Sequence, residues 1–217
     1  MTGPILVINP NSNPAVTAGL DAPLAPFRVA GGPEIEAVTL EEGPFGIESQ
    51  VDSDSVILPL VHLVQRRSDA SAVVIACYSD PGLEACRNAT ASPVLGIQEA
   101  GVLTALSLGD RFGVIALSRA SIDRHRRYLR RMGVLDRLAA ERPVDLSVHD
   151  TAAGSDAFDR LRDAGHALCR EDGADAIVLG CAGMAAHRAQ LERDIGCPVI
   201  DPTQAAVAMA LGRVLGP

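Results

Sequence analysis

The sequence predicts an α/β protein made of two similar lobes, each a small parallel sheet with helices on both faces, related by a pseudo-two-fold axis. Three observations support this prediction. Short apolar runs rich in β-branched residues alternate with helical segments, which is typical of parallel sheets. The order of these segments occurs twice along the chain. Two of the runs, Val73-Val-Ile-Ala-Cys77 and Ile177-Val-Leu-Gly-Cys181, also end alike, on a small residue followed by a cysteine.

The spacing of matching positions repeats as well. In the first half, 68 residues separate Asn9, near the end of the first strand, from Cys77. In the second half, 65 residues separate Ala116 from Cys181. We therefore expect three segments: residues 1–97 as the first lobe, 98–202 as the second lobe, and a final helix within 203–217 that packs back on the first lobe.

The first half is expected to contain four strands and the helices between them. The strands are predicted over residues 5–8, 34–40, 72–76 and 93–97. Ser12 or Asn13 can cap a helix that has Pro14 at its first position. The next helix contains Pro59, so we expect a kink or a late start there. Asp80 is expected to cap the helix that follows the third strand.

The second half is expected to repeat this order. Its strands are predicted over residues 112–117, 145–149 and 176–179. Helices are predicted over residues 98–108, 122–132, 155–171 and 203–215, the first of them crossing between the lobes. Gly133 and Gly173 follow two of these helices, where a left-handed residue commonly ends a helix.

The charge of the chain excludes several classes of partner. The net charge of −8 argues against nucleic acids and anionic membranes, because both require a basic surface.

No apolar run approaches the roughly 18 residues that a membrane-spanning helix needs. The start, Met1-Thr-Gly-Pro4, lacks the basic and apolar regions of a leader peptide. We expect a cytoplasmic homo-oligomer that acts on a small molecule.

No pattern in the sequence predicts a metal or an organic cofactor. The five histidines are scattered, and neither a His-x-x-x-His nor a Cys-x-x-Cys pair is present. A phosphate-binding glycine loop and a dinucleotide fingerprint are also missing. Five cysteines, an odd number, fit reduced thiols better than disulfides. Cys86, Cys169 and Cys197 are interpreted as structural, and the arginines between 124 and 131 as a solvated helix face.

Both repeated cysteines are expected at the site of chemistry. Ligands of open parallel sheets bind beyond the carboxyl ends of the strands, where Asn11, Cys77, Ser118 and Cys181 are predicted to lie. A cysteine just before a helix has its thiolate favoured by the helix dipole. If two lobes face each other, one thiolate can remove a proton from an acidic carbon while the opposite thiol supplies one. This is what inversion at that carbon requires.

Four motifs are distinctive: Ile8-Asn-Pro-Asn-Ser12, Cys77-Tyr-Ser-Asp-Pro-Gly-Leu83, Gly96-Ile-Gln-Glu-Ala100 and Gly180-Cys-Ala-Gly-Met184. They resemble the aspartate/glutamate/hydantoin racemase superfamily. The first and the last are most similar to its hydantoin and allantoin racemase branch. The resemblance covers nearly the whole chain. It implies racemisation without a cofactor, with Cys77 and Cys181 as the acid–base pair. The expected substrate-binding residues are Asn11, Ser12, Tyr78, Ser79, Ser118, Ala182 and Gly183.

Several alternatives remain open from the sequence. Ser12, Ser79 and Ser118 can serve only as turn or cap residues. The substrate can be a 5-substituted hydantoin, allantoin, or an amino acid such as aspartate or glutamate. Other enzymes with this resemblance are maleate isomerase and arylmalonate decarboxylase, although the decarboxylase needs only one of the two thiols. A two-lobed small-molecule binding protein without chemistry is the non-enzymatic alternative.

Overall fold

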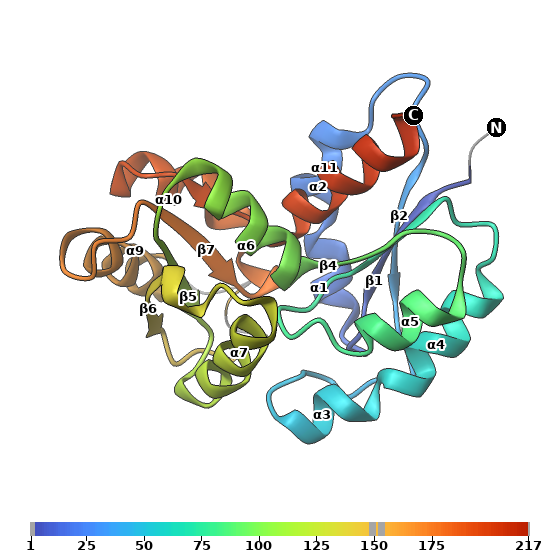
Figure 1. The fold of residues 1–217 in the computed structure, drawn as a ribbon, viewed down its shortest axis with the longest axis horizontal. Helices are drawn as coiled ribbons and strands as arrows, with labels where there is room; N and C mark the ends of the chain where they lie inside the picture. The colour runs from blue at the N-terminus through green and yellow to red at the C-terminus, as the bar shows by residue number, and fades with distance from the viewer. Residues whose placement is uncertain (1–2, 148–150, 152–154, 217) are drawn as a thin grey trace.

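The chain forms two four-stranded parallel sheets, shown side by side in Figure 1. The computed structural model describes residues 3–147, 151 and 155–216. The strand orders are β2-β1-β3-β4 and β6-β5-β7-β8, so the second sheet repeats the topology of the first. The first sheet consists of β1 (Ile5–Asn9), β2 (Ile35–Thr39), β3 (Ala72–Ile75) and β4 (Val94–Gly96). The second consists of β5 (Phe112–Ala116), β6 (Leu138–Pro143), β7 (Ala176–Gly180) and β8 (Val199–Ile200). This arrangement confirms the predicted fold class.

Helices and short 3-10 segments connect the strands. In the first half they are α1 (Pro14–Gly19), α2 (Asp21–Leu24), η1 (Ala25–Phe27), α3 (Gln50–Ser55), α4 (Ile57–Arg66) and α5 (Leu83–Ala89). In the second half they are α6 (Ile97–Leu108), α7 (Arg119–Met132), η2 (Leu135–Arg137), α9 (Ser155–Arg170), η3 (Ala182–His187), α10 (Arg188–Ile195) and α11 (Pro202–Leu215). None of the described helices is long and apolar enough to cross a membrane.

The central strands are buried because helices cover both faces of each sheet. Every residue of β1, β3, β5 and β7 is buried, as expected for parallel strands. One apolar cluster joins the sheets through α6 and α11, and it includes Val74 of β3, Val178 of β7, Val102 of α6 and Val207 of α11. The lobes therefore share a continuous core. This core holds the two sheets, and with them the carboxyl ends of their strands, in fixed positions relative to each other.

The last helix contacts both lobes. It packs along α6 and also contacts β1 and β3 of the first sheet. At its start, Gln204 Nε2 donates a 2.7 Å hydrogen bond to the carbonyl of Pro23. The division into segments 1–97, 98–202 and 203–217 stays a prediction.

One predicted strand is wrong. The strand expected over residues 145–149 is instead β6, which pairs with β5 from Phe112↔Leu138 to Ala116↔Pro143. Asp145 has a φ of 49°, a left-handed conformation that a strand does not accommodate. Residues 148 and 149 of the predicted segment lie outside the described residues. Pro143 is tolerated because β6 is an edge strand.

Candidate active site

Cys77 lies in the turn between β3 and α5. Its backbone N–H donates to the carbonyl of Ile75, and its own carbonyl accepts from the N–H of Asp80, both at 3.0 Å. Helix α5 begins only at Leu83, after Gly82 in a left-handed conformation with a φ of 65°. The thiol is therefore carried by a tight turn beyond the end of β3.

Cys181 reaches the same edge of the second sheet by a shorter route. It follows Gly180, the last residue of β7, and is the N-cap residue of η3. A Cβ atom at Gly180 would lie 2.5 Å from the carbonyl oxygen of Ile115, so this position requires glycine. The carbonyl of Cys181 accepts from the N–H of Met184 at 3.1 Å, which closes the first turn of η3.

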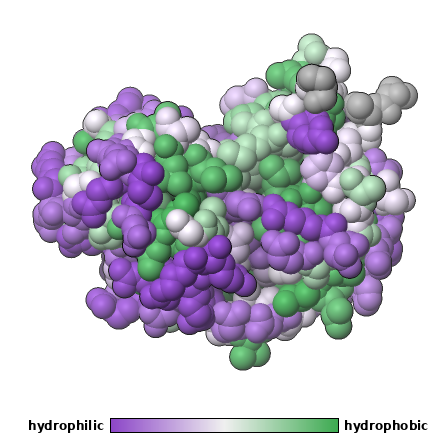
Figure 2. All heavy atoms as spheres, viewed as in Figure 1, coloured by the Kyte–Doolittle hydropathy of each residue, from purple (hydrophilic) through white to green (hydrophobic). Residues whose placement is uncertain are grey.

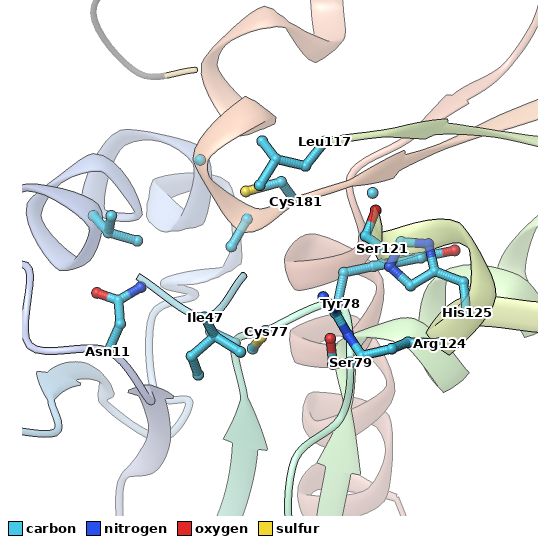
Figure 3. A pocket seen from close by; sticks show the side chains of 15 residues that line it. Asn11, Ile47, Cys77, Tyr78, Ser79, Leu117, Ser121, Arg124, His125 and Cys181 are labelled. Carbon is cyan, nitrogen blue, oxygen red and sulfur yellow. The ribbon is translucent and has the colours of Figure 1, made fainter. Parts of the chain in front are cut away.

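Both cysteines line one cavity between the lobes, with a volume of about 40 Å³. In Figure 3, Cys181 lies above the cavity and Cys77 below it, while Asn11 and Arg124 flank it on opposite sides. The lining residues are Asn11, Val16, Ile47, Ala76, Cys77, Tyr78, Ser79, Leu117, Ser121, Arg124, His125, Gly180, Cys181, Ala182 and Gly183. None of these described residues is a carboxylate, and the lining contains a single guanidinium, that of Arg124.

The structure brings together seven of the nine residues expected in the site. Asn11, Cys77, Tyr78, Ser79, Cys181, Ala182 and Gly183 all line the cavity. Ser12 lies outside the lining, and its N–H donates to the carbonyl of Pro44 at 2.9 Å. Ser118 also lies outside it, and its side chain makes no cap hydrogen bond to α7. One turn further along α7, Ser121 lines the cavity instead.

Asn11 is held by the turn that follows β1. Its Oδ1 accepts from Asn9 Nδ2 at 2.9 Å and from the N–H of Asn13 at 3.0 Å. Asn13 in turn caps α1 by accepting from the N–H of Ala15, with Pro14 at the first helical position, as predicted. Since its carbonyl oxygen is engaged within the turn, Asn11 can present its amide Nδ2 to a ligand carbonyl.

Burial has the largest effect on the two thiols. It raises the pKa of Cys77 to about 12, and it also raises the pKa of Cys181. Hydrogen bonds oppose this effect: the backbone N–H of Ser79 at Cys77, and the backbone of Gly183 with the side chain of Thr151 at Cys181. Each N–H group favours a thiolate over a thiol. The charge of Cys181 further raises the pKa of Cys77, so the pair favours one thiolate at a time.

The expected role of the helix dipole at Cys77 is wrong. Helix α5 starts six residues beyond the sulfur, at Leu83, and a dipole acts only within about the first turn. A single N–H from Ser79 replaces it. At Cys181 the expectation is closer, because this residue directly precedes η3, although burial still outweighs the effect of the N–H group there.

Comparison with known proteins agrees with this geometry. A family model described as Asp/Glu/Hydantoin racemase matches residues 5–210. The chain belongs to this family. It is therefore a racemase, which is a kind of isomerase. Membership of this family favours an enzyme over the non-enzymatic binding protein that the sequence left open.

Individual relatives resemble the racemase over almost its full length. A hydantoin racemase of Paenarthrobacter aurescens is 37% identical, covering 95% of this chain and 89% of the relative. A hydantoin racemase of Pseudomonas sp. (strain NS671) is 35% identical, covering 95% of this chain and 84% of the relative. The structure of an allantoin racemase from Klebsiella pneumoniae matches with a TM-score of 0.92 at 34% identity, covering 99% of this chain and 88% of that one. These comparisons confirm the resemblance stated from the four motifs.

Asp80 plays a different part in the racemase from the one predicted. It does not cap α5; its buried carboxylate accepts from the N–H groups of Gln98 and Glu99, both at 2.9 Å, and so caps α6. Tyr128 adds a side-chain hydrogen bond. Burial raises the pKa of Asp80 to about 7 despite these bonds. Asp80, with a φ of 43°, directly follows Ser79, whose N–H bonds Cys77, so the anchored carboxylate holds this turn in place.

A buried pair behind the cavity has no signal in the sequence. His125 lines the cavity and is 2% exposed. Its Nδ1 lies 2.8 Å from Oε2 of the buried Glu141, and its ring meets Tyr78 edge to face at 4.9 Å. The two residues lie on α7 and β6, 16 positions apart, so no local spacing links them. This pair therefore packs against Tyr78 and supports that side of the cavity.

The remaining cysteines lie outside the lining of the cavity. Cys86 is buried in the first lobe. Cys169 of α9 and Cys197, which follows α10, have sulfur atoms 2.7 Å apart in the second lobe. Among the described residues, no group of three or more side chains could hold a metal ion.

Proposed function

We propose that the racemase inverts the C5 carbon of a 5-substituted hydantoin or of allantoin, with Cys77 and Cys181 as its acid–base pair. The observation that carries this proposal is the position of the two thiols on opposite sides of one small cavity. The similarity to hydantoin and allantoin racemases supports this substrate class.

The chemistry follows from the acidity of the substrate carbon. The C5–H bond lies beside the C4 carbonyl, so removal of the proton by one thiolate leaves an enolate delocalised onto that oxygen. The opposite thiol then gives its proton to the other face of C5. One proton has left the carbon and one has arrived, the thiol and thiolate have exchanged roles, and the product is the mirror image.

Neighbouring groups support each step. The N–H groups of Ser79 and Gly183 stabilise the thiolate form of the adjacent cysteine. The amide of Asn11 and the guanidinium of Arg124 flank the cavity and can stabilise negative charge on the substrate oxygen. The apolar side chains of Val16, Ile47 and Leu117 limit the access of water.

The lining favours a neutral ring over a free amino acid. An amino acid carries an ammonium group, and the described lining residues include no Asp or Glu to pair with it. A buried ammonium without an anionic partner is costly. Aspartate and glutamate are therefore the weaker candidates. Location in the cytoplasm, homo-oligomer formation and operation without a cofactor stay predictions.

The test is to follow the circular dichroism of enantiopure substrates. Enantiomers of 5-methylhydantoin, 5-benzylhydantoin, allantoin, aspartate and glutamate would each be incubated with the protein after dialysis against EDTA. We expect loss of signal with hydantoins or allantoin, together with uptake of one deuterium at C5 in D2O. Racemisation of the amino acids alone, or activity that returns only when metal is added, contradicts the proposal.

A further inference from the structure

A second and larger depression adjoins the catalytic cavity. It has a volume of about 470 Å³, compared with about 40 Å³ for the cavity. Ser79 and Arg124 line both, so the two depressions are neighbours. Its wall includes Arg127, Arg130 and Arg131 of α7, and we call it the arginine groove. The groove therefore offers the room for a substituent that the cavity lacks.

The positive charges of the groove have no carboxylate partners among the residues that the structure describes. None of the described residues that line it is Asp or Glu, and in the described part of the chain none of its four arginines forms an ion pair. In contrast, arginines elsewhere in the described structure pair with carboxylates, for example Arg67 with Glu36 and Arg142 with Asp172. Asp52 acts on Arg124 only through its field, because its carboxylate accepts hydrogen bonds from Ser49.

Arg124 has a buried hydrogen-bond donor that the described residues leave unsatisfied. Its Nη1 donates to the carbonyl of Glu48 at 2.9 Å, but its buried Nε has no hydrogen-bond partner among the described residues. The side chain of Arg127 donates to a neutral acceptor, Gln50 Oε1, at 3.2 Å. A half-buried guanidinium without a counter-ion is unfavourable, and an incoming anion would relieve this cost. The two donors lie three residues apart on α7, on neighbouring positions of one face.

The groove also contrasts with the rest of the chain. The protein has a net charge of −8, so a cluster of unpaired arginines beside the active site is a local reversal of sign. Figure 2 shows hydrophilic side chains gathered over the region of α7. A positive depression in an otherwise negative surface attracts anions and raises their rate of association.

We propose that the arginine groove is a subsite for an acidic substituent at C5 of the hydantoin. The ring occupies the cavity between the thiols, and a carboxylate on a short alkyl arm binds Arg124 and Arg127. This inference rests on the proposed function and narrows it to 5-carboxyalkyl hydantoins. The carboxylate supplies the acceptor that Arg124 Nε lacks.

The test compares two substrates that differ by one charge. Enantiopure hydantoin-5-acetic acid and its primary amide, hydantoin-5-acetamide, have nearly the same shape. With the wild-type racemase we expect kcat/KM to be at least about tenfold higher for the acid, the usual size of one charge-assisted hydrogen bond. This preference should shrink as salt is added, since the attraction is electrostatic.

Three variants locate the subsite. Arg124→Gln and Arg127→Gln should each bring the ratio of acid to amide toward one. Arg126→Gln is the matched control, because Arg126 is exposed on the same helix and lines neither the cavity nor the groove. Arg124 also lowers the pKa of Cys77, so its loss can slow both substrates. The ratio cancels that effect.

The outcomes separate the two proposals. Racemisation of the amide and of neutral hydantoins without preference for the acid overturns the anionic subsite and leaves the proposed function intact. A preference that survives both Arg124→Gln and Arg127→Gln overturns the subsite as well. If no hydantoin is racemised, the proposed function fails and this inference fails with it.

Discussion

The turns that carry the two thiols differ more than the sheets that hold them. Both cysteines follow the third strand of sheets with the same topology. Cys181 begins its helical turn directly, whereas Cys77 is separated from α5 by five residues fixed through Asp80. A duplicated scaffold therefore delivers two thiols to one cavity, and the local turn decides what stabilises each thiolate. We call each thiol with the turn that carries it a half-site. The two half-sites should respond differently to substitution of nearby residues.

The largest effect is expected from removing either thiol. Cys77→Ser or Cys181→Ser should abolish racemisation, by about a thousandfold or more, because a hydroxyl is far too weak an acid and base. Each variant keeps one thiolate that faces one side of C5. In D2O, the two variants should exchange the C5 proton of opposite enantiomers, as measured by NMR. Exchange of the same enantiomer by both would contradict the two-base assignment.

The free energy of unfolding should depend on pH in the alkaline range because the thiol of Cys77 is buried. Burial raises the pKa of this thiol in the folded chain to about 12, against about 8.5 in the unfolded chain. The folded state thus holds the proton more tightly, so the stabilisation is complete below pH 8.5 and is lost as the pH rises from 8.5 toward 12. Between pH 8.5 and 10 the free energy of unfolding should fall by about 2 kcal/mol from this group.

Urea denaturation at several pH values measures this loss. Cys77→Ser removes the titrating group, so its stability should decline less steeply than that of the wild-type protein over the same range. Burial also raises the pKa of Cys86, to about 11, so Cys86→Ser should flatten the pH dependence in the same way and shows the effect of a buried thiol outside the cavity. Parallel curves for the wild-type protein and Cys77→Ser would show that the thiol titrates near its ordinary pKa.

A smaller effect should come from Asp80, and it should be confined to one half-site. In Asp80→Asn the amide can accept from only one of the two N–H groups that the carboxylate now binds. The turn that presents the N–H of Ser79 to Cys77 should loosen. Combined with Cys181→Ser, the substitution should slow deuterium exchange about tenfold. Combined with Cys77→Ser, it should change exchange at Cys181 little. Equal losses in both backgrounds would mean a general disturbance of the fold.

The repeated framework could be predicted because it depends on local patterns. Buried parallel strands appear as apolar runs, and the two cysteines mark equivalent ends of β3 and β7. Strand β6, at the edge of the second sheet, could not be predicted in this way. It contains Glu141, Arg142 and Pro143 and is only partly buried. The apolar residues just after it resembled a strand more closely.

The less predictable parts of the site are contacts between distant segments. Asp80-Pro81 looks like a local cap, but the carboxylate caps α6, 18 residues further along. The pairing of His125 with Glu141 depends on how α7 crosses β6. The arginines of α7 form a pattern that predicts a solvated face, because such a pattern shows which face of a helix is polar but not what that face borders. That they line a groove is a property of the tertiary structure.

The smallest effect is expected from substitutions in the turns after β1 and β5, and it concerns the free energy of unfolding. Asn13 caps α1 with a 3.0 Å hydrogen bond to the N–H of Ala15, whereas the side chain of Ser118 makes no such bond to α7. Asn13→Ala should therefore lower the free energy of unfolding by about 1 kcal/mol, and Ser118→Ala should change it by less than about 0.5 kcal/mol. Urea denaturation measures both. Racemisation by Ser118→Ala should stay at the wild-type rate, because Ser118 lies outside the cavity lining. A loss of activity in this variant would instead return Ser118 to the substrate-binding set.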